Sequence, residues 1–157
     1  MATIPTNGTK IYISSQIDTT VTNNATLYAA LTWVELKGVS SIGPIGDKAS
    51  EIRVDILSEN RTRKTKGVYD AGSPTIEFVP IASDPGQLAV IAALAVNGDY
   101  AFRVILNDKP AAGTSGTILY FAAQIMEAQR MMGPANNPLK YQAQLGITTA
   151  IIEVAAV

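Results

Sequence analysis

Two residue types that carry much of protein chemistry are missing: the 157 residues include no cysteine and no histidine. Without cysteine, the chain cannot form a disulfide or a thiolate zinc site. Without histidine, a Ser-His or Cys-His pair and a histidine-ligated metal are impossible within one chain. These absences remove thiol and imidazole chemistry, and together with the weak catalytic patterns considered below we expect no catalytic residues, no metal site and no cofactor.

Charged residues are scarce as well, at 16% of the chain against about 25% in typical soluble domains. The longest apolar run, residues 88–96, is only half of the ~18 residues that a membrane span needs, so we expect no membrane partner. The first residues also lack the basic start and apolar stretch of a signal peptide. Because so little of the surface carries charge, copies of the chain itself are the simplest partners to cover it.

Alternation of apolar and polar residues dominates what is present, and it predicts an all-β domain over residues 1–157. Residues 51–57, 100–106 and 139–147 are typical of half-buried strands with one face in a core. Further strands are expected at residues 10–17, 33–42, 75–81 and 117–127, the last apolar on both faces. An N-terminal arm or hairpin over residues 1–26 and a long loop over residues 60–74 complete a β-sandwich or open barrel.

One helix is expected after residue 83. Asp84 is a good N-cap, Pro85 suits the first helical position, and Gln87 completes a pattern like a capping box. Asn97 and Gly98 mark its end. The residues between them leave almost no polar face, which predicts a helix buried against a sheet and against a neighbouring subunit.

A basic cluster lies in the expected loop. Arg61, Arg63, Lys64 and Lys66 hold four of the twelve cationic side chains, while the rest of the chain has eight basic and thirteen acidic residues. Three interpretations remain open for this cluster: a salt-sensitive phosphate contact, a patch that meets an acidic surface of another copy, or a solvated hairpin tip.

Two patterns that superficially suggest catalysis do not support it. GTSGT at residues 113–117 has threonine where a nucleophile elbow needs its last glycine, and it reads as a hairpin loop. Glu51 and Asp55 share a strand face but lie about 13 Å apart along it, too far for a glycosidase pair. We therefore expect that the chain is not an enzyme.

Several of these segments together form a recognisable pattern. It comprises residues 8–13, WVELKGVSSI at 33–42, Gly46-Asp47 before a charged strand, DAGSP at 70–74 before the strand 75–81, the helix after Pro85, and the strands 100–106 and 139–147. With this pattern the chain resembles the tail tube (major tail) proteins of long, non-contractile-tailed bacteriophages. The basic character of residues 60–66 is a departure from what that family would lead one to expect.

The resemblance implies a virion structural protein, assembled in the host bacterial cytoplasm, that forms hexameric rings stacked into a hollow tail tube. The tube would surround a tape-measure protein, meet tail terminator and tip proteins, and conduct double-stranded DNA without binding it specifically. The inner tube of a contractile tail or secretion system shares the fold and stays an alternative. A β-sandwich module that binds carbohydrate or peptide is an alternative of another class.

Within that resemblance, each candidate surface receives a role. The ring–ring interface is expected at Arg61, Arg63, Lys64 and Lys66, because an acidic lumen lets DNA pass more freely than a basic one. The subunit-packing helix would use Leu88, Val90, Ile91 and Leu94. Two strand faces remain open as the lumen lining: Glu51, Arg53 and Asp55, or Lys140, Gln142 and Gln144.

Overall fold

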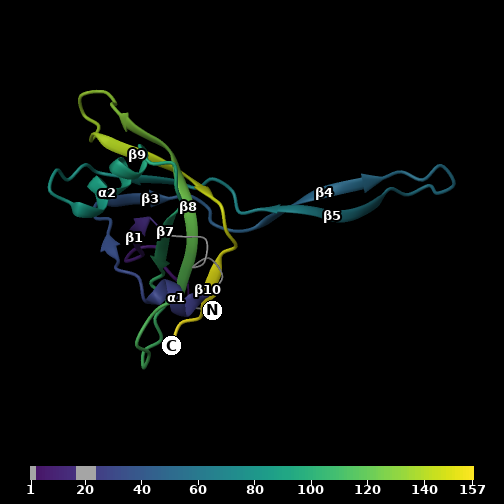
Figure 1. The fold of residues 1–157 in the computed structure, drawn as a ribbon, viewed down its shortest axis with the longest axis horizontal. Coiled ribbons are helices and arrows are strands. Elements are labelled where there is room, and N and C mark those ends of the chain that lie inside the picture. The colour runs from purple at the N-terminus through teal and green to yellow at the C-terminus, as the bar shows by residue number, and fades with distance from the viewer. Residues whose placement is uncertain (1–2, 17–23) are drawn as a thin grey trace.

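A computed structural model describes residues 3–16 and 24–157 (Figure 1). Most strands join one eight-stranded antiparallel sheet, in the order β2-β1-β7-β8-β9-β6-β3, with β10 paired to β8. These strands are β1 (Lys10–Gln16), β2 (Val34–Glu35), β3 (Val39–Ile42), β6 (Thr75–Phe78), β7 (Tyr100–Ile105), β8 (Ile118–Met131), β9 (Lys140–Ile147) and β10 (Ile152–Val154). The predicted all-β class is confirmed.

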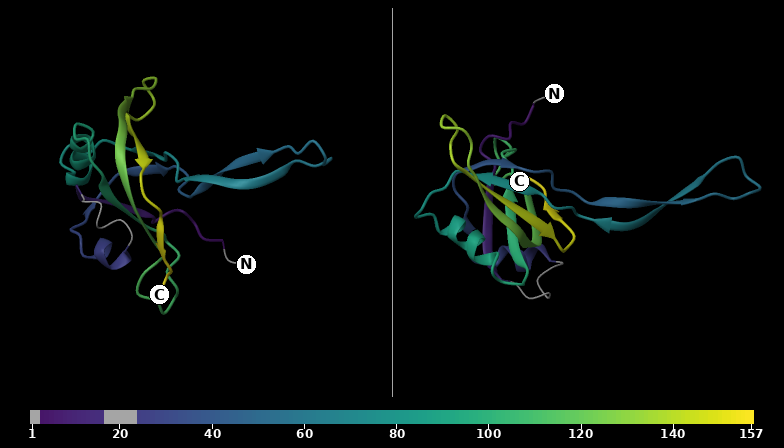
Figure 2. Two further views of the ribbon diagram at one scale, coloured as in Figure 1. Left: turned by 45° about the vertical axis from the view of Figure 1, so that its right-hand side comes forward. Right: turned by 90° about the horizontal axis from the view of Figure 1, so that it is seen from above.

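The remaining two strands form a hairpin that stands clear of the body. β4 (Lys48–Val54) and β5 (Arg63–Asp70) pair only with each other, and three views agree that they project away from the main sheet (Figures 1 and 2). Two predictions were therefore wrong. Residues 51–57 have no face in the core, and most of the loop expected over residues 60–74 is strand β5. Alternation correctly indicated a strand, but it does not say which surface the apolar row meets.

The main sheet curls around the larger of two apolar clusters among the described residues. Ile13 on β1 lies opposite Phe102 on β7, which in turn lies opposite Phe121 on β8. The Phe102 and Phe121 rings stack with centroids 5.7 Å apart, and both side chains are fully buried. At the other end of the sheet Phe78 stacks on Tyr141 at 5.5 Å. Aromatic and β-branched pairs across strands are what stabilise such a sheet.

The segment 33–42, expected as one strand, is two short strands at opposite edges of the sheet. Gly38 separates β2 from β3 with a φ of 74°, a left-handed conformation that favours glycine. β2 pairs with β1, whereas β3 pairs with β6 at the far edge. The sequence correctly predicted extended structure over this segment, but it did not predict the turn at Gly38.

A smaller layer covers the second face of β7 and β8, as the two-sided apolar pattern of residues 117–127 predicted. Helix α1 (Ala25–Ala29) begins at the N-cap Asn24 and buries Tyr28 completely against Tyr120, with ring centroids 5.5 Å apart. β10 pairs with β8 beside it, so the apolar end of the chain is docked. Residues 24–26 are thus folded rather than part of an arm, while residues 1–2 and 17–23 of the expected arm lie outside the described residues.

Helix α2 (Pro85–Ala93) packs on the curled sheet. Asp84 is its N-cap, as predicted, and its carboxylate accepts the backbone N–H of Gln87 at 3.1 Å. The reciprocal half of a capping box is not formed, because the Asp84 N–H donates to the Ile81 carbonyl instead. The helix also ends at Ala93, before the expected stop at Asn97.

The side chain of Gln87 has a different function. Buried beneath α2, it donates to the carbonyls of Lys37 at 2.7 Å and Val79 at 2.9 Å, and it accepts the N–H of Ile81 at 2.8 Å. These bonds join the helix to the turn after β2 and to the segment after β6. The sequence pattern pointed to this residue but to the wrong partners.

Candidate assembly surfaces

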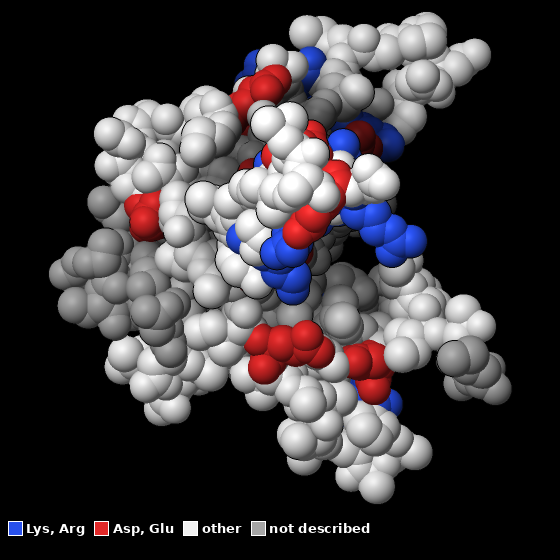
Figure 3. Space-filling view, turned by 90° about the vertical axis from the view of Figure 1, so that its right-hand side faces the viewer, with Lys and Arg blue, Asp and Glu red and all other residues white. Residues whose placement is uncertain are grey.

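The β4–β5 hairpin carries its charges mainly on one face. Register places Glu51 opposite Lys66 and Arg53 opposite Lys64, so these four side chains share a face. Glu51 forms ion pairs with both Arg53 and Lys64, the latter at 3.2 Å. Viewed along the hairpin, basic and acidic side chains lie next to one another rather than in separate patches (Figure 3).

The predicted basic cluster is consequently not one patch. Lys64 and Lys66 lie on the charged face, while Arg63 lies on the other face and its guanidinium binds Glu59, with Nε 2.9 Å from Oε2. Arg61 precedes β5. Neither Arg61 nor Lys66 forms an ion pair with another residue that the structure describes. Four carboxylates accompany the six cations between Lys48 and Asp70, so this part of the chain is only weakly basic.

The other face of the hairpin is apolar and uncovered. Ile52 lies opposite Thr65 and Val54 opposite Arg63, and both aliphatic side chains are 48% exposed. Ile56 continues the two-residue spacing towards the tip and is also exposed. A two-stranded hairpin without other support is marginally stable in water. An exposed aliphatic row on such an element therefore indicates a contact with another surface.

A second uncovered apolar surface lies on α2. The helix buries Val90 and Ala93 against the sheet, but its outer side exposes Leu88, Ile91 and Leu94. Val79 and Ile81 are exposed beside its first turn, where Gln87 binds their backbone. We call these five exposed side chains the α2 patch. Burial of the helix all round was wrong for the isolated chain, and of the four residues expected to pack a neighbour, Val90 packs inside its own subunit.

The two candidate lumen faces lie on different elements. Glu51 and Arg53 belong to the projecting hairpin, and Asp55 follows β4. Lys140, Gln142 and Gln144 lie on β9 in the main sheet, on the face opposite the buried Ala143 and Leu145. Neighbouring strands extend this second face with Glu77 opposite Gln142 and Glu127 opposite Gln144, and Lys140 Nζ lies 3.4 Å from Glu77. It is a polar surface of mixed charge, with the exposed side chain of Met126 beside Gly146 at one end.

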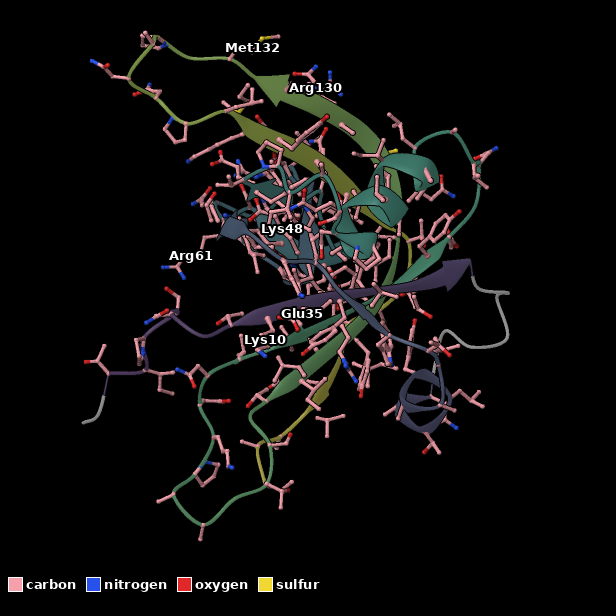
Figure 4. The ribbon with its side chains drawn as sticks, turned by 90° about the vertical axis from the view of Figure 1, so that its left-hand side faces the viewer. Lys10, Glu35, Lys48, Arg61, Arg130 and Met132 are labelled. Carbon is pink, nitrogen blue, oxygen red and sulfur yellow. The ribbon has the colours of Figure 1, made fainter. Side chains whose placement is uncertain are left out.

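The main sheet has open edges that other copies can extend. β2 and β3 are its outer strands, and β7 pairs with β8 only as far as Ala123, so residues 124–131 of β8 are paired on one side among the described residues. Figure 4 shows Arg130 and Met132 at the far end of β8. At the β1–β2 edge it shows Lys10 beside Glu35, with Lys10 Nζ 3.7 Å from Glu35 Oε1. Unpaired backbone groups along such edges favour pairing with another chain.

The cavities of the described residues differ in their lining, and one of about 570 Å³ at the end of β8 and β9 is lined in part by Glu77 and Lys140. A cavity of about 400 Å³ opens beside β3, and no charged residue that the structure describes lines it. Within the described ranges no three acidic side chains gather to hold a metal ion. Neither helix within residues 3–16 and 24–157 has the length and apolar character that a membrane crossing requires.

The GTSGT sequence lies in the loop between β7 and β8, as expected. The Ser115 hydroxyl donates to the Gly116 carbonyl at 2.9 Å, so it is engaged within the loop. Asp108 closes the same loop: its carboxylate accepts the Thr117 N–H at 2.6 Å and also the Thr117 hydroxyl. These hydrogen bonds lower the pKa of Asp108 below its ordinary value.

Thr117→Val should raise the pKa of Asp108 towards the ordinary value of about 3.9, because the hydroxyl hydrogen bond is lost while the backbone bond remains. Because the pKa of Asp108 is lower in the folded than in the unfolded chain, its ionised carboxylate stabilises the folded loop above about pH 4. This contribution is lost as the pH falls through the folded-state pKa. Titration of the Asp108 carboxyl carbon by NMR measures the shift. Thr114→Val, which does not contact Asp108, is the control; an unchanged Asp108 pKa in Thr117→Val would contradict the prediction.

Comparison with solved structures shows that this fold is similar to that of proteins from tail tubes and injection systems. No protein-family model matches the chain, and no curated protein is similar to it in sequence. Among solved structures, a protein of the SPP1 tail tube matches with a TM-score of 0.66 at 14% identity, over 98% of this chain and 81% of the other. A protein from the tail of a gene transfer agent particle, described with C6 symmetry, gives 0.64 at 18% identity, over 96% and 100%.

Contractile systems give matches of the same quality. A protein in the sheath/tube terminator structure of the extracellular contractile injection system PVC has a TM-score of 0.69 at 12% identity, over 99% of both chains. The similarity covers nearly the whole chain, as the sequence resemblance predicted, and it extends to the contractile systems that were the alternative. The chain has the fold of the tail tube proteins.

Proposed function

We propose that the chain is the structural subunit of a phage tail tube, forming hexameric rings that stack into a hollow cylinder within the virion. The observation that carries this proposal is the whole-chain match to tube proteins, one of them from a C6-symmetric tail. The open sheet edges and the two uncovered apolar surfaces support it. A closed ring would pair those edges and so remove a hazard of aggregation.

The polar face of β9 is our candidate for the lumen. Its strand belongs to the main sheet, which neighbouring copies extend into a barrel, whereas Glu51, Arg53 and Asp55 belong to a hairpin outside that sheet. Gln142 and Gln144 carry no charge, and Lys140 is paired with Glu77. Such a surface makes few phosphate contacts and lets double-stranded DNA pass without specific binding. The tape-measure protein would occupy the same space during assembly, and tail terminator and tip proteins would bind the two ends of the tube.

The basic residues of the hairpin are proposed to act between rings, at acidic groups of the next ring. Arg61→Glu with Lys66→Glu should shift assembly from tubes towards separate rings, because both side chains lack an ion pair within the described residues. Negative-stain microscopy of concentrated protein measures this outcome. Lys64→Glu is a less specific change, since it would place a second carboxylate beside Glu51 within the same hairpin.

Two results would contradict these proposals at different levels. Tubes of normal length from the Arg61→Glu, Lys66→Glu double variant would remove the ring–ring role of the cations. A monodisperse monomer at every concentration and ionic strength, seen by sedimentation, would remove the tube itself. The second result would favour the binding-module alternative, although Tyr69 is the only aromatic side chain among the described residues that is largely exposed.

An inner tube of a contractile tail or injection system is a second candidate, favoured by the similarity to the PVC terminator structure. In both roles the subunit forms the same kind of ring, so the fold does not separate them. A gene for a sheath protein next to the gene for this chain, and binding of that sheath protein to assembled tubes, would assign the contractile role.

A further inference from the structure

The apolar row of the β4–β5 hairpin and the α2 patch lack partners among the described residues of their own subunit. Ile52, Val54 and Ile56 are each at least a third exposed, and so are the five aliphatic side chains of the α2 patch. Single exposed aliphatic side chains are ordinary, but sets that are contiguous on one element indicate an interaction site. Any partner must therefore cover an aliphatic row on a narrow, projecting ribbon.

The α2 side carries almost no charge, which suits docking of the aliphatic hairpin face of another copy of this chain. Between residues 78 and 98 the only ionisable side chain is Asp84, which is buried and caps α2. The aliphatic face of the hairpin also carries Arg63, but its guanidinium is already paired with Glu59. A ribbon that docks on the α2 patch with this face would therefore bury no unpaired charge. Its opposite face, with Glu51 bound to Arg53 and Lys64, would point away from the α2 patch and leave Lys66 free for the ring–ring contact proposed above. Burial of an unpaired charge is the main cost that this arrangement avoids.

The two surfaces cannot meet within one subunit. The hairpin projects from one side of the body and α2 lies on the other, as all three ribbon views show (Figures 1 and 2). Contact between two different patches of identical chains is heterologous, and repetition of such a contact generates a closed ring or an open helical stack. This is the type of contact that a tube requires.

We infer that the aliphatic face of the β4–β5 hairpin docks on the α2 patch of another copy, which makes apolar burial rather than the hairpin's charges the main source of this contact. The inference rests on the proposed tube function and deepens it, since it names the two surfaces that join successive subunits. It assigns the exposed residues Leu88, Ile91 and Leu94 to an intermolecular contact, in agreement with the packing role expected from the sequence.

Cysteine cross-linking tests the contact directly, because the chain has no cysteine of its own. One preparation carries Ile52→Cys, a second carries Ile91→Cys, and the two are co-assembled and treated with a short bis-maleimide. We expect a covalent dimer from the mixture and none from either preparation alone. The Ile52→Cys, Ile91→Cys double variant should give a ladder of higher oligomers, as a head-to-tail contact requires. Arg53→Cys replaces Ile52→Cys in the matched control, because its side chain lies on the opposite face, and it should cross-link poorly.

Each outcome decides a different question. Tubes that form but give no mixed dimer, or a dimer from Ile52→Cys alone, would overturn the hairpin–α2 contact and leave the tube function intact. Failure of the unmodified chain to assemble at all would overturn both.

A charge-swap experiment gives an independent test. Ile52→Lys and Ile91→Glu should each raise the protein concentration needed for assembly at least about tenfold, because each buries a charge without a partner. Combining the two in one chain should recover a large part of that loss, since the lysine of one copy then meets the glutamate of the next. Equal additive losses in the combined variant would contradict direct contact. Both positions are exposed in the subunit, so circular dichroism of the dissociated chains should remain unchanged.

Discussion

Replacing Gln87 with alanine is expected to lower the free energy of unfolding by about 3 kcal/mol or more. The substitution leaves the Lys37 and Val79 carbonyls and the Ile81 N–H without the side-chain partner that they have in the folded chain. Each buried polar group left unsatisfied costs about 1–3 kcal/mol, and because these three hydrogen bonds are partly buried, we take each loss near the lower end of that range. Three such groups outweigh the small gain from alanine's higher helix propensity.

Urea unfolding, followed by Trp33 fluorescence at concentrations too low for assembly, measures this effect. Gln142→Ala is the matched control: it removes the same side chain from the half-exposed face of β9 and should change stability by about 0.5 kcal/mol or less. A loss below about 1 kcal/mol in Gln87→Ala would show that water or a rearranged backbone replaces these bonds.

Gly86→Ala is expected to destabilise the fold by about 2 kcal/mol or more, although alanine favours helix over glycine by about 1 kcal/mol. A Cβ atom at this position would lie 2.3 Å from the Glu35 carbonyl oxygen and 2.9 Å from the Leu36 Cα. Both atoms belong to backbone, so the clash is relieved only if α2 moves away from the turn after β2. Overpacking of this kind costs about 1–3 kcal/mol and occasionally more, and here it also weakens the contacts of Gln87.

Gly46→Ala provides the comparison, since a Cβ atom there meets nothing within 4 Å and the backbone is not left-handed. That variant should be neutral or more stable by about 0.4–1 kcal/mol, because alanine reduces the freedom of the unfolded chain. Thermal or urea unfolding of the two variants side by side separates steric clash from a general effect of replacing glycine. Equal stability of Gly86→Ala and the unmodified chain would contradict the close approach of α2.

The positions of most strands and the start of α2 were predictable because they depend on local pattern. Alternation over residues 100–106 and 139–147 located β7 and β9, and Asp84 with Pro85 located the first turn of α2. The apolar character of both faces of residues 117–127 predicted a strand covered on two sides, and the structure places Phe121 against the main core and Tyr120 against α1. These features follow from side chains a few residues apart.

The candidate surfaces were predicted less well. The basic cluster was found from the sequence, but its division between two faces and the pairing of Arg63 and Lys64 with carboxylates depend on register. The aliphatic row of residues 52, 54 and 56 was assigned to a core that it does not reach. Gln87 was noted for a cap that it does not complete, because its true partners lie up to 50 positions away along the chain.

The sequence by itself therefore determined the all-β class, the N-cap of α2 and the shortage of charge that suggests self-association, because each depends on composition or on neighbouring residues. Tertiary structure alone decided that β4 and β5 leave the body, that Gly38 sends β2 and β3 to opposite edges, and that the outer side of α2 stays uncovered. An alternating segment has the same local energetics whether its apolar side faces its own core or another molecule, and only the path of the whole chain distinguishes the two.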